Sequence, residues 1–151
     1  MARFSLVPYS NLNSRQQEIY NFQKVSGVLA DYGFATLHLT DDWNGADFLA
    51  VHVNGKTVLR VQLKSRLTFS KKYLGRKLWV CFRHDKVVYL YPHDKTAAEV
   101  RALAVKLRQK RYDQTKSWSK SNGGYSYPAP PRWLMGYLQR YRLGTEGESA
   151  P

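Results

Sequence analysis

Residues 45–66 read GADFLAVHVNGKTVLRVQLKSR and contain two apolar runs on either side of Asn54-Gly55. Asn-Gly between β-rich runs is the strongest short signal for a hairpin with a two-residue type I′ turn. We therefore predict strands at about 46–53 and 56–64. Three polar residues, Asp47, Gln62 and Lys64, interrupt these runs. Either they lie on a solvated surface, or they form a site.

The predicted turn fixes which residues of the two strands face each other. Val53 faces Lys56, so the numbers of paired residues sum to 109 and Asp47 lies opposite Gln62. Facing residues share one side of a sheet, with Cβ atoms about 4.5–5.5 Å apart. Strand periodicity places Lys64 on the same side as Gln62. The sequence thus predicts that the three polar side chains converge, while the apolar ones point to the other face.

The rest of the chain adds helices before and after this hairpin and further strands. We expect a helix from Asn13 or Ser14 to about Tyr32, opened by a capping box at Ser14 and Gln17 and ended by Gly33. Strands are predicted at residues 34–40, 78–83 and 87–92, the last two around His84-Asp85-Lys86. A helix over about 97–110 follows a capping box at Thr96 and Glu99, and a final helix follows Pro130-Pro131. Residues 68–77 read as a basic connector with at most an abbreviated helix, and residues 111–129 as irregular.

This order predicts an α+β (α/β-like) fold: an N-terminal helix packed on a central mixed β-sheet of about five strands, with two C-terminal helices. We expect an N-terminal arm over residues 1–12 and a single domain over residues 13–142. Within that domain, residues 13–92 form the core and residues 93–142 a C-terminal helical extension. Residues 143–151 are expected to be a disordered tail.

The chain has 24 Lys and Arg against 11 Asp and Glu, a net charge of +13. Such an excess favours a polyanionic partner, most often nucleic acid, although it could also serve only solubility. The basic residues concentrate in residues 60–84 and 101–120, and neither stretch has the amphipathic pattern that insertion into a membrane surface needs. The single cysteine, Cys81, reads as a core residue and fits a reducing, cytoplasmic setting. No secretory signal or membrane-spanning run is recognisable in the sequence.

Glu18 adds a fourth candidate to the three polar residues of the hairpin. At 100° per residue it points between Phe22, Val25 and Leu29, inside the apolar stripe of the first helix. A carboxylate there is costly unless it is paired or binds a metal. The alternative is a simple charge in the first turn that complements the helix dipole.

These four residue types have a joint chemical use. Asp47 offers a hard anionic oxygen to Mg²⁺ or Mn²⁺, Gln62 a carbonyl oxygen, and Glu18 a carboxylate that binds directly or through water. Lys64 can position or polarise an attacking water, or stabilise charge on a phosphate. Metal, water and lysine together suit phosphodiester hydrolysis.

The pattern Gly45-Ala46-Asp47 followed by Gln62-Leu63-Lys64 resembles the motif of the PD-(D/E)XK nuclease superfamily, in a D…QxK variant. The resemblance covers roughly the first 90 residues. It implies a helix leading into a mixed sheet and a glutamate from that helix, here Glu18, joining the metal site. The chain departs from the motif at Ala46, where proline is usual, and at Gln62, which replaces an acid as in some Mrr-like members. The third departure is that no clear helix is recognisable in the sequence between the third and fourth strands.

Basic residues around the motif strand are the expected contacts to a nucleic-acid backbone. The alternative for each of these basic residues is that it lies in an ordinary solvated loop. They are Arg66, Lys71, Lys72, Arg76, Lys77, Arg108, Lys110, Arg111, Lys116 and Lys120. Trp118 and Tyr125 could stack on bases or pack the last helix on the sheet. The four histidines have no metal-ligand spacing, and His84-Asp85 and His93-Asp94 read as turn residues.

The sequence therefore predicts a metal-dependent nuclease that acts on DNA, with Mg²⁺ or Mn²⁺ as cofactor. A homodimer is compatible with this prediction, because cutting a duplex often takes two sites. One alternative is a nucleic-acid-binding protein on the same fold that does not cut, which the substitution of Gln62 for an acid favours. Another is a basic partner of an acidic protein.

Overall fold

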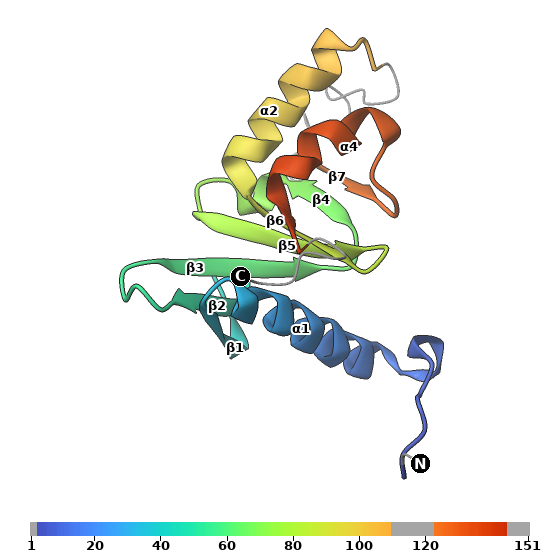
Figure 1. Ribbon diagram of the computed structural model, residues 1–151. Coiled ribbons are helices and arrows are strands. Elements are labelled where there is room, and N and C mark those ends of the chain that lie inside the picture. Colours follow the sequence, from blue (N-terminus) through green and yellow to red (C-terminus); the bar gives the residue numbers. More distant parts are fainter. Residues whose placement is uncertain (1–2, 110–122, 145–151) are drawn as a thin grey trace.

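The centre of the molecule is a mixed six-stranded sheet in the order β1-β2-β3-β5-β6-β8 (Figure 1). This computed structural model describes residues 3–109 and 123–144. Only β3 and β5 pair in parallel; the other neighbours are antiparallel. The predicted α+β fold is confirmed, and β8 adds a sixth strand that the sequence did not indicate. The strands are β1 (Phe34–Trp43), β2 (Ala46–His52), β3 (Val58–Lys64), β5 (Leu78–His84), β6 (Val87–Pro92) and β8 (Arg142–Leu143).

Helix α1 (Ser14–Asp31) covers one face of this sheet (Figure 1). Val25 and Leu29 are fully buried there against a cluster that includes Phe48 and Val61. The helix begins one residue earlier than the predicted capping box. Asn13 is the N-cap: its Oδ1 accepts the Gln16 backbone N–H, and its own backbone N–H donates to Gln16 Oε1. The predicted end is confirmed, since Gly33 follows with φ +79°.

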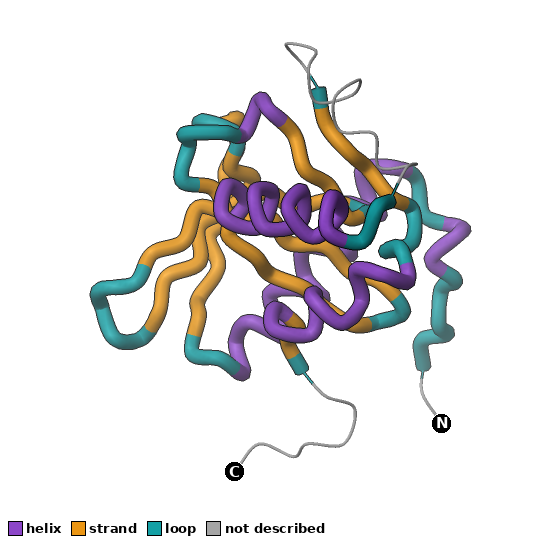
Figure 2. Tube along the Cα trace, turned by 90° about the horizontal axis from the view of Figure 1, so that it is seen from above, coloured by secondary structure: helices purple, strands orange, loops and turns teal. Residues whose placement is uncertain are grey.

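The other face carries helices α2 (His93–Lys106) and α4 (Arg132–Leu138) with a small sheet of β4 (Leu67–Ser70) and β7 (Gly124–Tyr127). Figure 2 shows α2 lying across the strands. The capping box predicted at Thr96 is wrong, because α2 begins at His93 and Thr96 is buried within it. Burial of the His93 side chain fixes the first turn earlier than the local sequence indicates.

Strands β4 and β7 correct two predictions of irregular structure. The connector between β3 and β5 contains β4 and the short 3₁₀ helix η2 (Lys71–Tyr73), which is the abbreviated helix expected there. Gly124 was read as part of an irregular segment, yet it pairs with Ser70. A Cβ at Gly124 would lie 2.5 Å from the carbonyl oxygen of Phe69, so the glycine allows the two backbones to approach closely.

The register of the β2–β3 hairpin agrees with the prediction. Phe48 pairs with Val61 and Val51 with Val58, so paired numbers sum to 109. The predicted type I′ turn is wrong, because such a turn needs a positive φ at both central residues, and Gly55 has one but Asn54 does not. Residues 53–56 form a longer loop in which Asn54 Oδ1 accepts the N–H groups of Lys56 and Thr57. This loop has the same centre as the predicted turn and therefore preserves the register.

The N-terminal end of the described chain lies apart from this core, whereas the C-terminal end joins the central sheet through β8. Before α1, a segment with the 3₁₀ turn η1 (Tyr9–Asn11) projects from the body, and Phe4, Leu6 and Val7 are exposed (Figure 1). After α4, the 3₁₀ turn η3 (Gln139–Tyr141) leads into β8, which includes Leu143. The rest of the predicted tail, residues 145–151, lies outside the described residues. Among the described helices, none has the length and apolar character needed to cross a membrane.

Candidate active site

Asp47 and Gln62 meet where the ladder between β2 and β3 ends. The last backbone pair is Phe48 with Val61. Beyond it, Asp47 Oδ2 accepts hydrogen bonds from Gln62 Nε2 and from the Leu63 backbone N–H, both at 2.8 Å. The carboxylate thus holds the end of the hairpin together through its side chain. The predicted convergence of Asp47 and Gln62 is present.

Lys64 lies beside this pair on the face of the sheet opposite α1. It pairs with Phe82 of β5, which belongs to the cluster under α2 and α4. Its Nζ lies 5.6 Å from the ring centroid of Tyr73, a buried residue of the connector. The positive charge of Lys64 also lowers the pKa of Asp47, so the two side chains interact electrostatically.

Burial raises the pKa of Asp47 above its ordinary value. The Leu63 N–H and the charge of Lys64 lower that pKa, while the negative charges of Glu18 and Asp42 raise it further. The net direction is upward, because loss of water and like charges outweigh the favourable partners. Asp47 is therefore a half-buried carboxylate whose ionised form would gain from an additional cation.

Asp42 is a member of this region that the sequence reading did not identify. It lies in the irregular end of β1, where the pairing with β2 shifts between His38 and Trp43. Its Oδ1 accepts the Gly45 N–H at 2.6 Å, and Gly45 has φ +87°. The available signal was the pair Asp41-Asp42 shortly before Asp47, but the strand predicted over residues 34–40 ends before this pair, whereas β1 includes it.

Glu18 does not lie in the buried stripe of α1, which corrects the sequence prediction. Its side chain is exposed, while the buried contacts come from Val25 and Leu29 further along the helix. The helical period does not show where the sheet next to the helix ends, and the first turns of α1 slope away from the sheet (Figure 1). Glu18 has no ion-pair partner among the described residues, and it acts on Asp47 through its charge.

A divalent cation would find two suitable oxygens at this junction. In residues 3–109 and 123–144, no three His, Cys, Asp or Glu side chains gather as a metal site. Asp47 Oδ1, however, accepts no hydrogen bond from the described residues, and the Gln62 amide presents its carbonyl oxygen in addition to the bonded Nε2. Carboxylate and amide oxygens are ligands that Mg²⁺ accepts while it retains several waters. The donor set therefore fits a metal bound by few protein ligands.

The connector brings basic side chains to the same place. A Cβ built on Gly45 would lie 3.6 Å from Arg76 Nη1 and 3.6 Å from Tyr73 Cδ1, so both residues pack on the turn that precedes Asp47. Lys72 Nζ lies 5.1 Å from the Tyr73 ring centroid, and Tyr73 thus contacts the cations of both Lys64 and Lys72.

The other predicted backbone contacts are spread more widely. Arg66 and Lys77 are exposed and Lys71 is half-buried in the same connector, whereas Arg108 is exposed beyond the end of α2. Tyr125 is buried in the core under α4, which matches its packing alternative. Four basic residues and one aromatic lie outside the described residues: Lys110, Arg111, Lys116, Lys120 and Trp118.

His93 and Asp94 form a second polar cluster that the sequence reading took for turn residues. His93 is fully buried; its Nε2 accepts the Ser70 N–H at 3.0 Å, and its Nδ1 donates to Asp94 Oδ1 at 2.9 Å. Asp94 Oδ2 accepts the Gly75 N–H at 2.9 Å. Burial lowers the pKa of His93, against the opposing effect of Asp94. This neutral histidine ties Ser70 of the connector to the start of α2, and Asp94 ties Gly75 to it.

Cys81 is a free, fully buried thiol in β5, as predicted for a core residue. Burial raises its pKa, which keeps it protonated and unreactive. His84 lies 3.3 Å from Asp85 in the β5–β6 turn, where Asp85 and Lys86 both have positive φ. This is the geometry of a type I′ turn, found here instead of at Asn54-Gly55.

No family model matches the chain, and no curated protein matches it. Two solved structures are similar to it. One is Hjc, a Holliday junction resolvase from Archaeoglobus fulgidus, with 18% identity over 46% of this chain and 74% of that one, and a TM-score of 0.37. The other is the bacterial homing endonuclease I-Ssp6803I, with 12% identity over 85% of this chain and 94% of that one, and a TM-score of 0.46. Neither similarity is close enough to assign a function to a residue of this chain.

Proposed function

We propose that this protein is a divalent-metal-dependent deoxyribonuclease whose site lies at the β2–β3 junction. The observation that carries the proposal is the Asp47 carboxylate. It is half-buried and accepts a hydrogen bond from Gln62. Its pKa is raised by burial, although the charge of Lys64 lowers it in part. The structural role of this carboxylate, which is to accept the Gln62 amide and the Leu63 N–H, uses Oδ2 and leaves Oδ1 without a hydrogen bond from the described residues.

The residues of the site would have different roles in hydrolysis. Asp47 and Gln62 would hold Mg²⁺ or Mn²⁺, with Glu18 contributing through water from the edge of the sheet. The metal supplies Lewis-acid stabilisation of charge on the phosphate. Lys64 positions or polarises the attacking water, whose oxygen forms a bond to phosphorus as the bond to the leaving sugar oxygen breaks. The ammonium group also balances negative charge that develops on the phosphoryl oxygens.

The basic connector supports a nucleic-acid substrate for this site. Residues 60–84 carry eight Lys and Arg and no Asp or Glu. Arg76 packs on the turn before Asp47, and Lys72 shares the Tyr73 ring with Lys64. Cations placed this way would contact the sugar-phosphate backbone next to the bond that is cut, without reading its sequence.

The second candidate is a nucleic-acid-binding protein that does not cut. The observation that favours it is the amide of Gln62, which donates to Asp47 where an acid would add negative charge for a metal. The two candidates share the basic surface and differ in what the junction does. Binding alone would need the charge of the connector but not Asp47.

Cleavage of a DNA panel tests the proposal. Plasmid, linear duplex, single-stranded and branched DNA are incubated with Mg²⁺ or Mn²⁺, and with a chelator as the metal control. The variants are Lys64→Met, which keeps the aliphatic stem over Tyr73, and Lys56→Met, which removes a charge at the far end of the same hairpin. We expect metal-dependent cutting that Lys64→Met abolishes and Lys56→Met retains. If the wild type binds the panel but cuts no substrate in it, the non-cutting candidate is correct.

A further inference from the structure

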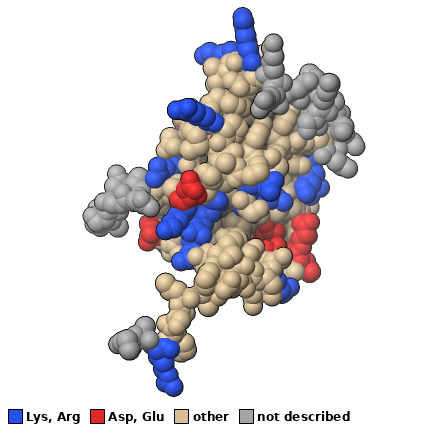
Figure 3. All heavy atoms as spheres, turned by 90° about the vertical axis from the view of Figure 1, so that its right-hand side faces the viewer, with Lys and Arg blue, Asp and Glu red and all other residues tan. Residues whose placement is uncertain are grey.

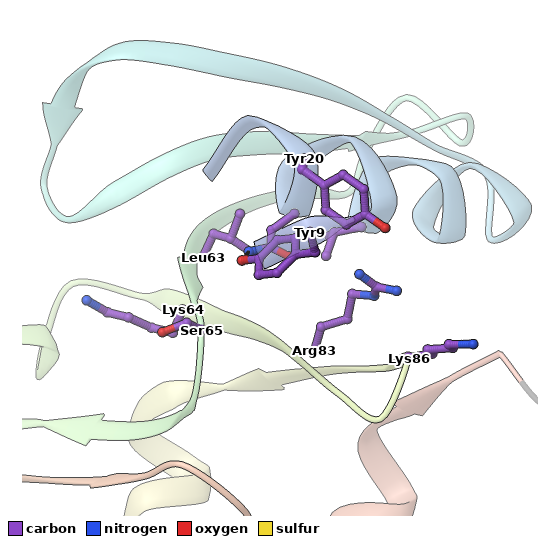
Figure 4. Close-up of a pocket in the computed structure, with 9 residues that line it drawn as sticks. Tyr9, Tyr20, Leu63, Lys64, Ser65, Arg83 and Lys86 are labelled. Carbon is purple, nitrogen blue, oxygen red and sulfur yellow. Dashed lines mark hydrogen bonds between the residues drawn. The ribbon is translucent and has the colours of Figure 1, made fainter. Parts of the chain in front are cut away.

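A basin lies on the α1 side of the end of β3, next to the Asp47 junction, with which it shares Lys64 (Figure 4). Its volume is about 440 Å³, within the range of small-ligand sites. The N-terminal segment and α1 contribute Tyr9, Tyr20 and Asn21, and the end of β3 contributes Ser65. Strand β5 and its following turn contribute Arg83 and Lys86. The basin thus combines aromatic, amide, hydroxyl and cationic groups, and no acidic residue lines it.

Arg83 and Lys86, two cations of the basin, have no acidic ion-pair partner among the described residues. The guanidinium of Arg83 lies 5.9 Å from the ring centroid of Tyr20. Lys86 occupies the second central position of the type I′ turn, with φ +64°. Neither forms an ion pair with a described residue, and the neighbouring Asp85 is engaged with His84. Figure 3 shows Lys and Arg side chains across the middle of one face of the molecule, with one acidic side chain among them.

The aromatic wall of the basin is also ordered by specific contacts. Tyr9 and Tyr20 have ring centroids 5.2 Å apart. Asn21 Nδ2 donates to the Tyr9 hydroxyl at 2.9 Å, which fixes the N-terminal segment against α1. Lys24 Nζ lies 5.3 Å from the Tyr20 ring centroid, so another cation lies close to the same ring. Rings next to unpaired cations are the combination that binds a nucleotide through its base and its phosphate.

The position of the basin relates it to the Asp47 junction. Leu63, Lys64 and Ser65 are consecutive at the end of β3, and all three border the basin. In Figure 4 the Lys64 side chain points away from Arg83 and Lys86, towards the other side of the strand. A chain of nucleotides that passes over the end of β3 would therefore meet Lys64 on one side and the basin on the other.

We infer that the basin binds an unpaired nucleic-acid strand that continues from the phosphate held at Lys64. The inference rests on the proposed function for the nucleic-acid character of the ligand. The strand must be unpaired because the bases of a duplex are covered by their neighbours and cannot present a face to Tyr9 or Tyr20. The substrate class is then a duplex with a single-stranded tail or branch.

Binding to tailed and blunt DNA tests this inference. Fluorescence anisotropy, with chelator present to prevent cutting, measures the affinity for one duplex with and without a short single-stranded tail. The test variant is Arg83→Gln with Lys86→Asn, since asparagine tolerates the positive φ at that position. The matched control, Lys56→Gln with Lys106→Gln, removes two exposed charges elsewhere. Thermal unfolding checks that both double variants are folded.

We expect the wild type to bind the tailed duplex more tightly than the blunt one, and the test variant to lose this preference. Its salt slope for the tailed duplex should fall by about 1.4, from two lost phosphate contacts at about 0.7 each. The control should keep the preference. The inference is overturned if the wild type binds both DNAs alike, if it binds neither, or if the control loses the preference as the test variant does.

The result separates this inference from the proposed function. If the protein cuts no DNA but prefers tailed DNA through Arg83 and Lys86, strand binding in the basin is supported and the proposed nuclease activity is excluded. If the protein cuts DNA in a metal-dependent way but has no preference for a tail, strand binding in the basin is excluded and the proposed nuclease activity is supported.

Discussion

Two polar clusters of this molecule, the β2–β3 junction of Asp47, Gln62 and Lys64 and the His93–Asp94 pair, differ in how completely their groups are satisfied. Both ring nitrogens of His93 and both oxygens of Asp94 have hydrogen-bond partners. At the junction, Asp47 Oδ2 accepts two hydrogen bonds, while Oδ1 accepts none from the described residues. A fully satisfied buried network stabilises a fold, whereas a carboxylate with an unused oxygen is available to a ligand.

The charges of the two clusters differ as well. Burial lowers the pKa of His93, so the ring is neutral and needs no counter-ion. Burial raises the pKa of Asp47, and Glu18 and Asp42 add negative charge to its surroundings. The cost of the ionised carboxylate would be offset by a bound cation. The comparison indicates that His93 serves stability and Asp47 serves function, and the following experiments test that division.

Asp47→Asn should have the largest effect, on cleavage. Asparagine retains an oxygen that can accept the Leu63 N–H but loses the charge that would hold the metal. We expect the cleavage rate to fall at least about a hundredfold. The melting temperature at pH 7 should be unchanged or higher, because the substitution removes a half-buried charge near two like charges. A variant that cuts normally, or that loses activity only because it unfolds, contradicts the division.

His93→Leu should have the opposite profile. It leaves the Ser70 N–H and one Asp94 oxygen without their partner, so we expect a loss of about 2–3 kcal/mol in the free energy of unfolding. Urea denaturation measures the loss. Cleavage per folded molecule should be retained where the variant remains folded. A stable variant that has lost activity would place His93 in the functional region.

Gln62→Glu sharpens the comparison by adding charge to the junction. The donor to Asp47 is lost and two carboxylates then face each other, so the variant should be about 1 kcal/mol less stable than the wild type in chelator. A divalent metal should reverse this, because it would bind two acids. Thermal unfolding with and without Mn²⁺ should show a larger metal-induced rise for Gln62→Glu than for the wild type. Equal rises would exclude Gln62 as a neighbour of the metal.

His93 should contribute to the pH dependence of stability, and we expect this effect to be smaller than those of the three substitutions above. Its pKa in the folded state lies below the ordinary 6.5, so the unfolded chain takes up a proton first as the pH falls. The free energy of unfolding therefore decreases below pH 6.5, until the folded-state pKa is reached. His93→Gln keeps an acceptor for Ser70 but cannot titrate, and its stability should depend less on pH in this window. If the free energy of unfolding depends on pH in the same way in the wild type and in His93→Gln, then His93 does not contribute to this dependence.

The sequence predicted the junction better than the His93 cluster, for a physical reason. The contact between Asp47 and Gln62 depends only on the centre of the Asn54-Gly55 loop and on strand periodicity, both of which are local. The turn type was wrong, but the centre, and therefore the register, was right. The burial of His93 arises instead from packing between the connector and α2, which no local pattern encodes.

Other misses have the same origin. Strands β4 and β7 are short and pair across more than 50 residues of sequence, so neither has a strong signal of its own. For Glu18, the helical period gives a direction but not where the sheet beneath the helix ends. Asp42 reaches the site because β1 is irregular after His38, and that irregularity is a tertiary feature.

The most direct test of the central claim is calorimetric titration of Mn²⁺ into the wild type and Asp47→Asn at pH 7. The account predicts saturable binding to the wild type that Asp47→Asn abolishes, in a variant at least as stable as the parent. If the wild type and Asp47→Asn bind Mn²⁺ alike, or if neither binds it, the β2–β3 junction is not a metal site, and the basic surface would then act without it.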